Sequence, residues 1–424
     1  MRFITTWTFN PNDPISFARY FAKVEGTVLL YSGGKLDSAC HSYLCLFPEE
    51  KIQVKAKKGC WDELKEYLGT FDSPSSILKW VGFIGYEMGA FADLDIEIPC
   101  FSSEIPDALF YRPTVVIHFD HKTRQATLYG DKEISLKQPP PLSYGSEVKL
   151  RFRSDSLESY LAKIREIKNW ILEGKLYQLN LSQEFLFEGK SDPFDIFQKI
   201  CSLNPTAFSA YMQCGDFTIV SSSPERFLSR KGSRLETRPI KGTIPRGQTA
   251  LEERLNRNRL LNSEKERAEL LMITDLMRND LGKVSFPGSV NTKEIWRCEA
   301  YTNVFHLLSI IEGRCDAEPV PLIRQLFPGG SITGCPKLSA MEAITLLEQR
   351  PRGVYTGSIG YFSAHGDFDF NIAIRTLVIN SASIRLALGG AIIIDSDPMK
   401  EFEETLHKGQ SLFQVLGANE LCLL

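Results

Sequence analysis

The stretch VYTGSIGYF (residues 354–362) begins a run of three apolar segments, which continues with FDFNIAIRTLVI (368–379) and IRLALGGAIII (384–394). Segments of this length that are rich in β-branched and aromatic residues predict strands. The spacers between them are short, and a final helix is predicted from about Pro398. Strands joined in hairpins, with helices kept apart from them, indicate an α+β fold and argue against alternating βαβ units.

A strand with a polar face is predicted over residues 176–187. Because side chains alternate along a strand, Gln178, Asn180 and Ser182 lie on one face. That face meets either water or a polar cavity. The other elements predicted after residue 150 are a helix capped by Ser154 or Asp155 and ended by Gly174, strands over 217–220, 227–230 and 234–240, a helix over 263–279, strands over 290–296 and 304–311, and a helix over 336–349.

A proline-rich connector divides the chain. The segment Lys137-Gln-Pro-Pro-Pro-Leu-Ser-Tyr-Gly145 contains three consecutive prolines, which forbid helix and favour an extended linker. We place a boundary here, between an N-terminal region over residues 1–145 and a second region over 146–424. The elements predicted in the first region are strands over 27–31 and 114–118 and a glycine-punctuated apolar segment over 80–86.

The composition is that of an ordinary globular protein of 424 residues, with 43% hydrophobic and 24% charged residues. A formal net charge of -3 gives no overall positive field, so neither nucleic acid nor an anionic membrane surface is expected as the main partner. The 10 cysteines form no Cys-x-x-Cys pair and are interpreted as reduced thiols. The sequence shows neither a signal-peptide pattern nor an apolar run of membrane-spanning length, so the expected location is cytoplasmic.

Two pairs of glutamates lie three residues apart on predicted helices. Glu266 and Glu269 form one pair, Glu401 and Glu404 form the other, and this spacing puts both members of a pair on one helical face. If the two faces oppose each other, their carboxylates supply the hard oxygen ligands that magnesium prefers. The alternative stays open, because Ser263 and Glu266 fit a capping box and paired glutamates on helices are usually solvated.

A glycine-rich loop, FPGGSITGCPK, runs into a predicted helix at residues 327–337. Pro336 takes the favoured first position of that helix. The amides of the loop and the helix dipole suit a carboxylate or a phosphate, and the Thr333 hydroxyl can add a donor. Nucleotide binding is disfavoured, because the segment lacks the Lys-Ser/Thr pair of a Walker loop. A tight turn without a ligand also explains the glycines.

Two cations are candidate ligand contacts. Arg375 lies inside the predicted apolar strand over residues 372–377, where an unpaired charge is costly to bury. Its guanidinium can bind a carboxylate in bidentate fashion, and Lys408, on the helical face of Glu401 and Glu404, offers a second positive charge. A structural salt bridge explains Arg375 as well as a ligand does.

Lys241 is the candidate nucleophile. It follows Arg238-Pro-Ile240 at a predicted strand end and precedes Gly242, which lets the backbone approach a bound molecule. To attack, its amine must be neutral, and this requires desolvation or a nearby cation that lowers its pKa. Glu225, in Ser223-Pro-Glu225, is a candidate proton donor if burial raises its pKa. An ordinary surface charge is the alternative for either residue.

Taken together in this order, these segments resemble the chorismate-utilising family that includes anthranilate synthase, aminodeoxychorismate synthase, isochorismate synthase and salicylate synthase. Several independent motifs in one order make a chance resemblance negligible, although the N-terminal third contributes mainly GFIGY (82–86). The other motifs are YQLNLS (177–182), SPE (223–225), PIKGT (239–243), RAE (267–269), MITDLMRND (272–280), His306-Leu307, the loop over 328–337, Tyr355, Ile374-Arg375 and residues 401–408.

The resemblance implies a fold, a metal and a set of site residues. The implied fold is a two-lobed α+β sandwich of two facing antiparallel sheets with helices outside. The implied cofactor is Mg2+, with Glu269 and Glu404 as direct ligands and Glu266 and Glu401 holding metal-bound waters. Glu225 is implied to assist loss of the 4-hydroxyl of chorismate. The implied substrate contacts are Thr333, His306, Tyr355, Arg375, Lys408 and the backbone of Gly389 and Gly390.

Two positions favour one reaction within the family. The isochorismate and salicylate enzymes carry a water-activating lysine where this chain has Gln178, and glutamine cannot take that proton. Anthranilate synthases typically carry alanine in the Pro-Ile-x-Gly-Thr segment, whereas Lys241 resembles component I of aminodeoxychorismate synthase. The implied reaction is attack of Lys241 on C2 of chorismate as the 4-hydroxyl leaves, followed by attack of ammonia on C4. The product is 4-amino-4-deoxychorismate, from which a separate lyase makes 4-aminobenzoate for folate.

Ammonia needs a source, because this sequence contains no Gly-x-Cys-x-Gly nucleophile elbow with a downstream His-x-Glu. A separate glutaminase, a glutamine amidotransferase subunit, is the implied partner. Tryptophan feedback is not expected, since Leu29-Leu-Tyr-Ser32 departs from the Leu-Leu-Glu-Ser motif of anthranilate synthases. Gly389-Gly-Ala391 also departs from the usual three glycines. The alternatives are anthranilate synthase component I and an inactive chorismate-binding subunit, and the intact Glu225 and Lys241 weigh against the latter.

Overall fold

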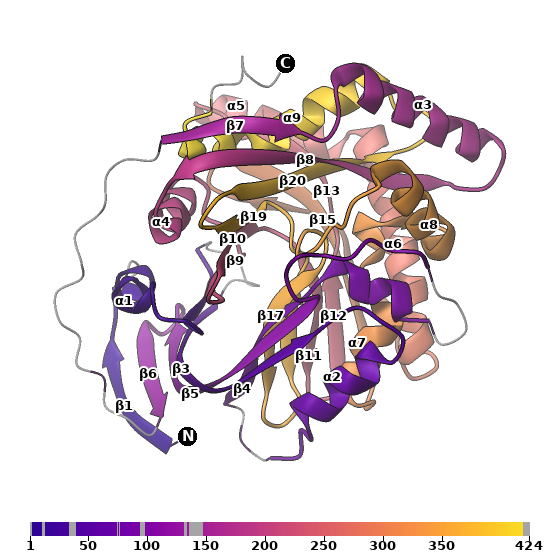
Figure 1. Cartoon of the computed structure of the whole chain (residues 1–424). Helices are drawn as coiled ribbons and strands as arrows, with labels where there is room; N and C mark the ends of the chain where they lie inside the picture. The colour runs from indigo at the N-terminus through magenta and orange to yellow at the C-terminus, as the bar shows by residue number, and fades with distance from the viewer. Residues whose placement is uncertain are drawn as a thin grey trace.

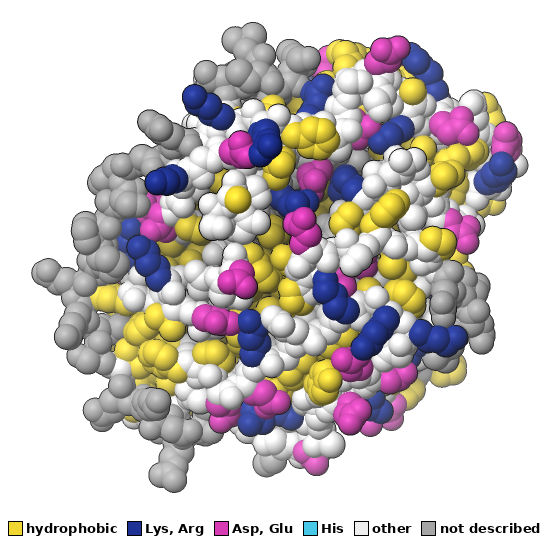
Figure 2. Space-filling view, viewed as in Figure 1, with side chains coloured by type: hydrophobic (Ala, Val, Ile, Leu, Met, Phe, Trp, Pro, Cys, Tyr) yellow, Lys and Arg dark blue, Asp and Glu magenta, His cyan; other side chains and the backbone are white. Residues whose placement is uncertain are grey.

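The computed structural model describes residues 2–10, 13–33, 40–73, 75, 77–93, 98–130, 134 and 147–418. The proline-rich connector over residues 137–145 lies outside the described residues, and the division of the chain at residue 145 stays a prediction. Within the described part, no helix has both the length and the apolar character needed to cross a membrane. Figure 2 shows basic and acidic side chains interspersed on one face of the molecule, as the small net charge leads one to expect.

Two long strands, β3 (His41–Val54) and β5 (Ala108–Asp120), pair with each other and join two antiparallel sheets (Figure 1). The His41 half of β3 and the Asp120 half of β5 belong to the first sheet, and their other halves belong to the second. A register shift after Pro48 and a positive φ at Phe47 lie where the pair passes from one sheet to the other. Bulges bend strands in this way.

Every strand pairing in both sheets is antiparallel within the described residues. The first sheet has the order β1 (Arg2–Thr8), β6 (Gln125–Gly130), β5, β3, β2 (Val28–Tyr31), β9 (Phe208–Gln213), β10 (Phe217–Ser223), β19 (Thr376–Asn380), β20 (Ile384–Ile392), β8 (Gln178–Lys190) and β7 (Glu147–Arg153), with β16 (Gly334–Cys335) on the start of β8. The second has the order β3, β5, β4 (Leu78–Ile84), β17 (Ser358–Ser363), β18 (Phe368–Asn371), β11 (Arg226–Lys231), β12 (Arg234–Arg238) and β15 (Val304–Arg314), with β13 (Ile240–Pro245) and β14 (Asn291–Ala300) also on β15.

Apolar side chains pack in layers that explain this arrangement. One buried cluster takes residues from β2, β9 and β10 of the first sheet and from β4 and β17 of the second, so the two sheets face each other. The outer face of the first sheet is covered by α1 (Asp13–Phe21), α4 (Pro193–Leu203) and α9 (Pro398–Leu416). The outer face of the second is covered by α2 (Cys60–Leu68), α6 (Glu264–Val284), α7 (Pro319–Leu326) and η1 (Tyr86–Phe91). The remaining helices are α3 (Leu157–Leu172) and α8 (Lys337–Glu348) beside β8, α5 (Ala250–Leu261) beside β13, and the short η2 (Gly330–Ile332). The predicted α+β sandwich is confirmed.

The three segments near the C-terminus form strands, with one correction. FDFNIAIRTLVI is broken into β18 in the second sheet and β19 in the first. Arg375 lies in the break with φ 52°, so the prediction that it sits inside a strand was wrong. The chain has to turn there because consecutive strands belong to different sheets.

Smaller differences concern helix ends. The cap of α3 is Ser156, whose Oγ accepts a hydrogen bond from Ser159 N, and not Ser154 or Asp155. Pro336 is the N-cap of α8 and precedes its first helical position. Both helices lie within about two residues of the predicted limits, which is the usual uncertainty of helix ends. The helix predicted from Pro398 is confirmed as α9.

Candidate active site

The chain crosses between the two sheets at two adjacent places, and each crossing carries a predicted site residue. Glu225 lies where β10 leads into β11, and Arg375 lies where β18 leads into β19. The crossings are hydrogen-bonded to each other: Ile372 N donates to Glu225 O at 3.0 Å, and Ser222 N donates to Arg375 O at 3.1 Å. Residues 150 positions apart in the sequence are thereby held in one site.

Glu225 has the surroundings of a proton donor. Its side chain is buried, and Ser331 Oγ donates a hydrogen bond to Glu225 Oε1 at 2.7 Å. Burial raises the pKa of Glu225 to about 7, although the Ser331 hydrogen bond and the charge of Lys241 act in the opposite direction. A carboxyl group with this pKa is protonated in about half of the molecules at neutral pH and can both give and take a proton there.

A β-bulge directs Lys241 into the same site. The register of β13 against β15 shifts between Lys241 and Thr243, and Gly242 has φ 77°. The positive φ favours glycine at this position, and a Cβ there would lie 2.9 Å from Glu266 Oε2. The Lys241 side chain is partly buried. Burial and then the charge of Lys408 lower its pKa, against the carboxylates of Glu269, Glu225 and Glu404.

His306 on β15 contributes a neutral imidazole. Its Nδ1 forms a hydrogen bond with Thr243 Oγ1 at 2.8 Å, and the Tyr301 ring packs edge-on at 4.8 Å. Burial, together with the charge of Arg375, lowers the pKa of His306 to about 3. Its Nε2 is buried and has no hydrogen-bond partner among the residues that the structure describes. A bound molecule would satisfy this nitrogen.

Arg375 is the second group in the site that needs a ligand. In the described part of the chain its guanidinium forms no hydrogen bond or ion pair, which disfavours the structural salt bridge that the sequence left open. Burial lowers its pKa, and Glu225 and Tyr301 act in the opposite direction. A partly buried guanidinium without a protein carboxylate suits an anionic ligand.

Two glycines on β20 let neighbouring side chains come close to the backbone. A Cβ at Gly389 would lie 2.9 Å from the Tyr355 hydroxyl oxygen, and a Cβ at Gly390 would lie 3.4 Å from Lys408 Nζ. Lys408 Nζ donates to Gly389 O at 3.2 Å and forms an ion pair with Glu404 Oε1 at 2.8 Å. Tyr355, both glycines and Lys408 therefore lie together and form one wall, and their implied contacts with a substrate stay a prediction.

Thr333 is buried. Its hydroxyl donates to Gly329 O at 3.0 Å, so that donor is already engaged. Its carbonyl oxygen accepts a hydrogen bond from Asn180 N on β8 at 2.8 Å. The loop that carries Thr333 is thus held against the strand whose polar face the sequence predicted.

The four glutamates, two on α6 and two on α9, all act on the charge of one cation, Lys265. Burial acts to lower the pKa of Lys265, but the charges of Glu269, Glu401, Glu266 and Glu404 outweigh burial and raise it. Lys265 Nζ lies 3.8 Å from Glu269 Oε1. Burial raises the pKa of Glu266, and the neighbouring Glu269 carboxylate adds to the effect. The pKa of Glu401 is likewise raised by burial, although Ser396 Oγ donates a hydrogen bond to Glu401 Oε1 at 2.7 Å. No group of three acidic, histidine or cysteine side chains positioned to hold an ion is found among the described residues.

Comparisons with known proteins decide the family. The model of the chorismate binding enzymes matches residues 28–414. The chain belongs to the chorismate binding enzyme family. Aminodeoxychorismate synthase component 1 of Klebsiella aerogenes is 38% identical over 77% of this chain and 75% of its own length. The Salmonella typhimurium protein of the same name is 35% identical over 94% of this chain and 95% of its own.

A solved structure supports the same conclusion. Anthranilate synthase component I from Streptococcus pneumoniae superposes with a TM-score of 0.77 at 27% identity, over 88% of this chain and 92% of that one. The resemblance stated from the motifs is confirmed. This chain is therefore a chorismate binding enzyme with the fold of its family.

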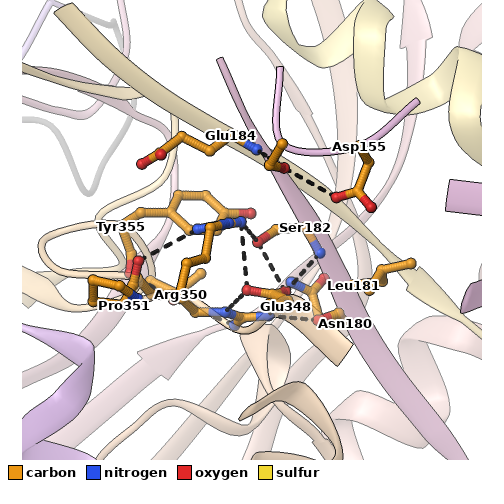
Figure 3. A network of polar contacts seen from close by, with 12 residues as sticks. Asp155, Asn180, Leu181, Ser182, Glu184, Glu348, Arg350, Pro351 and Tyr355 are labelled. Carbon is orange, nitrogen blue, oxygen red and sulfur yellow. Dashed lines mark hydrogen bonds and ion pairs between the residues drawn. The ribbon is translucent and has the colours of Figure 1, made fainter. Parts of the chain in front are cut away.

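A buried ionic network that sequence reasoning missed supports the wall of this chorismate binding enzyme (Figure 3). Glu348, at the end of α8, accepts hydrogen bonds from Ser182 N at 2.8 Å and from Ser182 Oγ at 2.9 Å. Arg352 binds the same carboxylate through Nη2 at 2.7 Å and through Nε at 3.0 Å, and Arg350 pairs with it at 3.4 Å. Figure 3 shows Arg350 reaching Ser182, with Tyr355 beside it.

Arg352 connects this network to the glycine-rich loop. Its Nη2 donates to Asn180 O at 2.7 Å and its Nη1 donates to Ile332 O at 3.1 Å. Its guanidinium also lies 5.8 Å from the centre of the Tyr355 ring. All three side chains of the polar face of β8 are buried, and that of Ser182 meets the buried polar groups of this network.

Two cavities lie outside the set of predicted site residues. The first, of about 370 Å³, is lined in part by Tyr31 and Ser32 of the segment compared with the tryptophan motif. The second is lined in part by Tyr177, Gln178 and Met272. Gln178 is buried, and its Nε2 lacks a partner within the described residues. None of the predicted catalytic, substrate or metal residues lines either cavity.

Proposed function

We propose that this chain is component I of an aminodeoxychorismate synthase, which aminates C4 of chorismate with ammonia from a separate glutaminase. The observation that carries the proposal is the pairing of Lys241, whose pKa is lowered, with Glu225, whose pKa is raised to about 7. A lysine at this bulge can act as a nucleophile, which an alanine cannot. The names of the Klebsiella and Salmonella relatives support the same activity.

In the first step, Lys241 and Glu225 act together. The neutral amine of Lys241 forms a bond to C2 of chorismate, the ring double bonds shift, and the C4–O bond breaks. Glu225 gives its proton to the departing oxygen, which leaves as water, and becomes a carboxylate. The added amine carries the positive charge, so protons and electrons balance.

In the second step, ammonia forms a bond to C4, the ring double bonds shift back, and the C2–N bond to Lys241 breaks. Lys241 leaves as a neutral amine, and the new ammonium group at C4 can return a proton to Glu225. The two steps replace one difficult substitution by two easier ones. The pyruvyl ether of chorismate is untouched, so the product is 4-amino-4-deoxychorismate.

The remaining site residues hold the substrate. Arg375, without a carboxylate partner in the described part of the chain, and Tyr355 on the glycine wall are proposed to bind carboxylates of chorismate. The Nε2 of His306 is proposed to contact the ring substituents. Holding the reacting atoms of Lys241 and C2 in line lowers the entropic part of the barrier.

The chemistry of these residues fits a magnesium ion, although the described side chains are not gathered around a single ion position. The two proposed ligands and the two residues proposed to hold metal-bound waters are all carboxylates. Burial raises the pKa of Glu266 and the neighbouring Glu269 charge adds to the effect, and a dication would oppose both. Glu269 and Glu404 would hold the ion, and Glu266 and Glu401 would hold its waters. When bound, the ion supplies a positive charge and a template for a substrate carboxylate.

One experiment tests the proposed function. The purified chain is incubated with chorismate, MgCl2 and an ammonium salt, and the product is identified by mass and ultraviolet spectrum. We expect 4-amino-4-deoxychorismate. Anthranilate as the main product would assign the chain to the other component I branch, and isochorismate would contradict the role given to Gln178. Recovery of chorismate alone would support the inactive subunit.

Substitution of Glu404 tests the metal site. Glu404→Ala is expected to lower both the magnesium affinity and the activity. Each loss should exceed the roughly 10- to 100-fold that removal of an outer-shell partner costs. The measurement is magnesium affinity by isothermal titration calorimetry, alongside turnover at several magnesium concentrations. Glu403→Ala, at an exposed neighbouring position on α9, is the control and should bind magnesium normally. An unchanged affinity in Glu404→Ala would refute the ligand assignment.

A further inference from the structure

We propose that Ser331 is a positioning residue for Glu225, and that its hydroxyl selects which carboxyl oxygen carries the transferred proton. Ser331 Oγ donates to Glu225 Oε1 at 2.7 Å. A protonated carboxyl group carries its proton on one oxygen, and its other, carbonyl oxygen is the stronger acceptor, so donation from Ser331 to Oε1 favours the proton on the opposite oxygen. The proton is therefore directed to Oε2. The identity of the leaving group rests on the proposed function, whereas the hydrogen bond does not.

Both partners are held rigidly, so this selection is built into the fold. Glu225 is 6% exposed and Ser331 is 7% exposed. The backbone of Glu225 is fixed at the sheet crossing, where its carbonyl accepts from Ile372 N at 3.0 Å. A group whose geometry is set before the substrate binds needs no reorganisation during the reaction.

The loop that carries Ser331 is fixed on both sides. A Cβ at Gly329 would lie 2.8 Å from Ile372 Cδ1, and a Cβ at Gly330 would lie 2.8 Å from Leu276 Cδ2. Beyond Ser331, the carbonyl oxygen of Ile332 accepts from Arg352 at 3.1 Å. The glycines therefore serve close packing of the loop, which places a serine hydroxyl against Glu225.

The hydrogen bond also helps the proton leave. When Glu225 gives up its proton, Ser331 donates to a carboxylate, and hydrogen bonds to charged acceptors are stronger than those to neutral ones. The bond stabilises the product of proton transfer more than the reactant. In agreement with this, the Ser331 hydrogen bond lowers the pKa of Glu225, although burial dominates and keeps the pKa raised.

The test compares Ser331→Ala with Ser331→Thr, which keeps the hydroxyl. The pKa of Glu225 is measured by 13C NMR titration of glutamate-labelled protein, with the resonance assigned from Glu225→Gln. We expect Ser331→Ala to raise the pKa of Glu225 and to lower kcat about 10-fold, the effect of a hydrogen bond of about 1.4 kcal/mol, with little change in KM. Ser331→Thr should restore both values toward those of the wild type.

Ser202→Ala is the matched control, because this serine on α4 donates to Gln198 O away from the site. It should leave the pKa of Glu225 unchanged. If Ser331→Ala folds, as judged by its thermal unfolding, and shows the wild-type pKa, the role of Ser331 is overturned. If the wild type forms a different product while Ser331→Ala still raises the pKa, the proposed function fails and the positioning role survives.

Discussion

Replacement of Lys241 by alanine is expected to lower kcat for formation of 4-amino-4-deoxychorismate by at least about 10³-fold, because removal of a nucleophile leaves only binding and electrostatic effects. Lys241 lies at a bulge where Gly242 has the positive φ of 77° that favours glycine, and burial together with Lys408 lowers the pKa of Lys241. The same substitution should abolish any covalent adduct between the chain and chorismate. Chorismate binding should survive, since Arg375 and Tyr355 are unchanged.

The adduct is measured by intact-protein mass spectrometry after acid quench of the wild type and the variant with chorismate and magnesium, in the absence of ammonia. Lys190→Ala is the control, because this lysine at the end of β8 is exposed. It should form the adduct as the wild type does. An adduct of equal yield in Lys241→Ala would move the nucleophile to another residue, and a small loss of kcat would reject the covalent route.

The sequence predicted well those features that depend on a few consecutive residues. The spacing of Glu266 and Glu269 sets them on one face of a helix, and Pro398 begins a helix, whatever the rest of the chain does. Gly242 has a positive φ, which glycine readily adopts, whereas its close approach to a bound molecule stays a prediction. These features depend on a few consecutive residues and their backbone angles.

The points at which the chain passes from one sheet to the other could not be predicted in the same way. An apolar run such as residues 368–379 fits one long strand or two shorter ones equally well. What decides is the distant partner of each half: β18 pairs with β11 and β17, and β19 pairs with β10 and β20. Arg375 therefore owes its place at the site, and its unusual backbone angle, to contacts far away in the sequence.

The site was assembled from the sequence through the resemblance to a family, not through spacing. Glu225 and Arg375 become neighbours only because two crossings of the sandwich run side by side. Ser331 was quoted within the loop but given no role, since nothing in the sequence places its hydroxyl against a carboxylate 106 positions away. Glu348 and Arg352, four residues apart, have the spacing of an ordinary solvated ion pair, yet both are buried.

Glu348→Ala is expected to lower the free energy of unfolding by about 3–5 kcal/mol, the usual cost of leaving a buried charge without its partner. The Glu348 side chain is 0% exposed and that of Arg352 is 1% exposed. Without the carboxylate, Arg352 keeps its bonds to Asn180 O and Ile332 O but loses its neutralising charge. The NH and hydroxyl groups of Ser182 lose their acceptor as well.

The measurement is urea unfolding followed by circular dichroism, with Glu342→Ala as the control because Glu342 is exposed on the same helix. The control should change the free energy of unfolding by less than about 0.5 kcal/mol, as surface substitutions usually do. A second control is Arg352→Met, which removes the buried cation while filling its space, and leaves Glu348 with Arg350 and Ser182. If Glu348→Ala lowered the free energy of unfolding by less than about 1 kcal/mol, the network would not be what holds the loop and the strand β8 together.

Because Arg352 bonds to the loop on which Ser331 lies, we also expect Glu348→Ala to lower kcat even at temperatures where the variant stays folded.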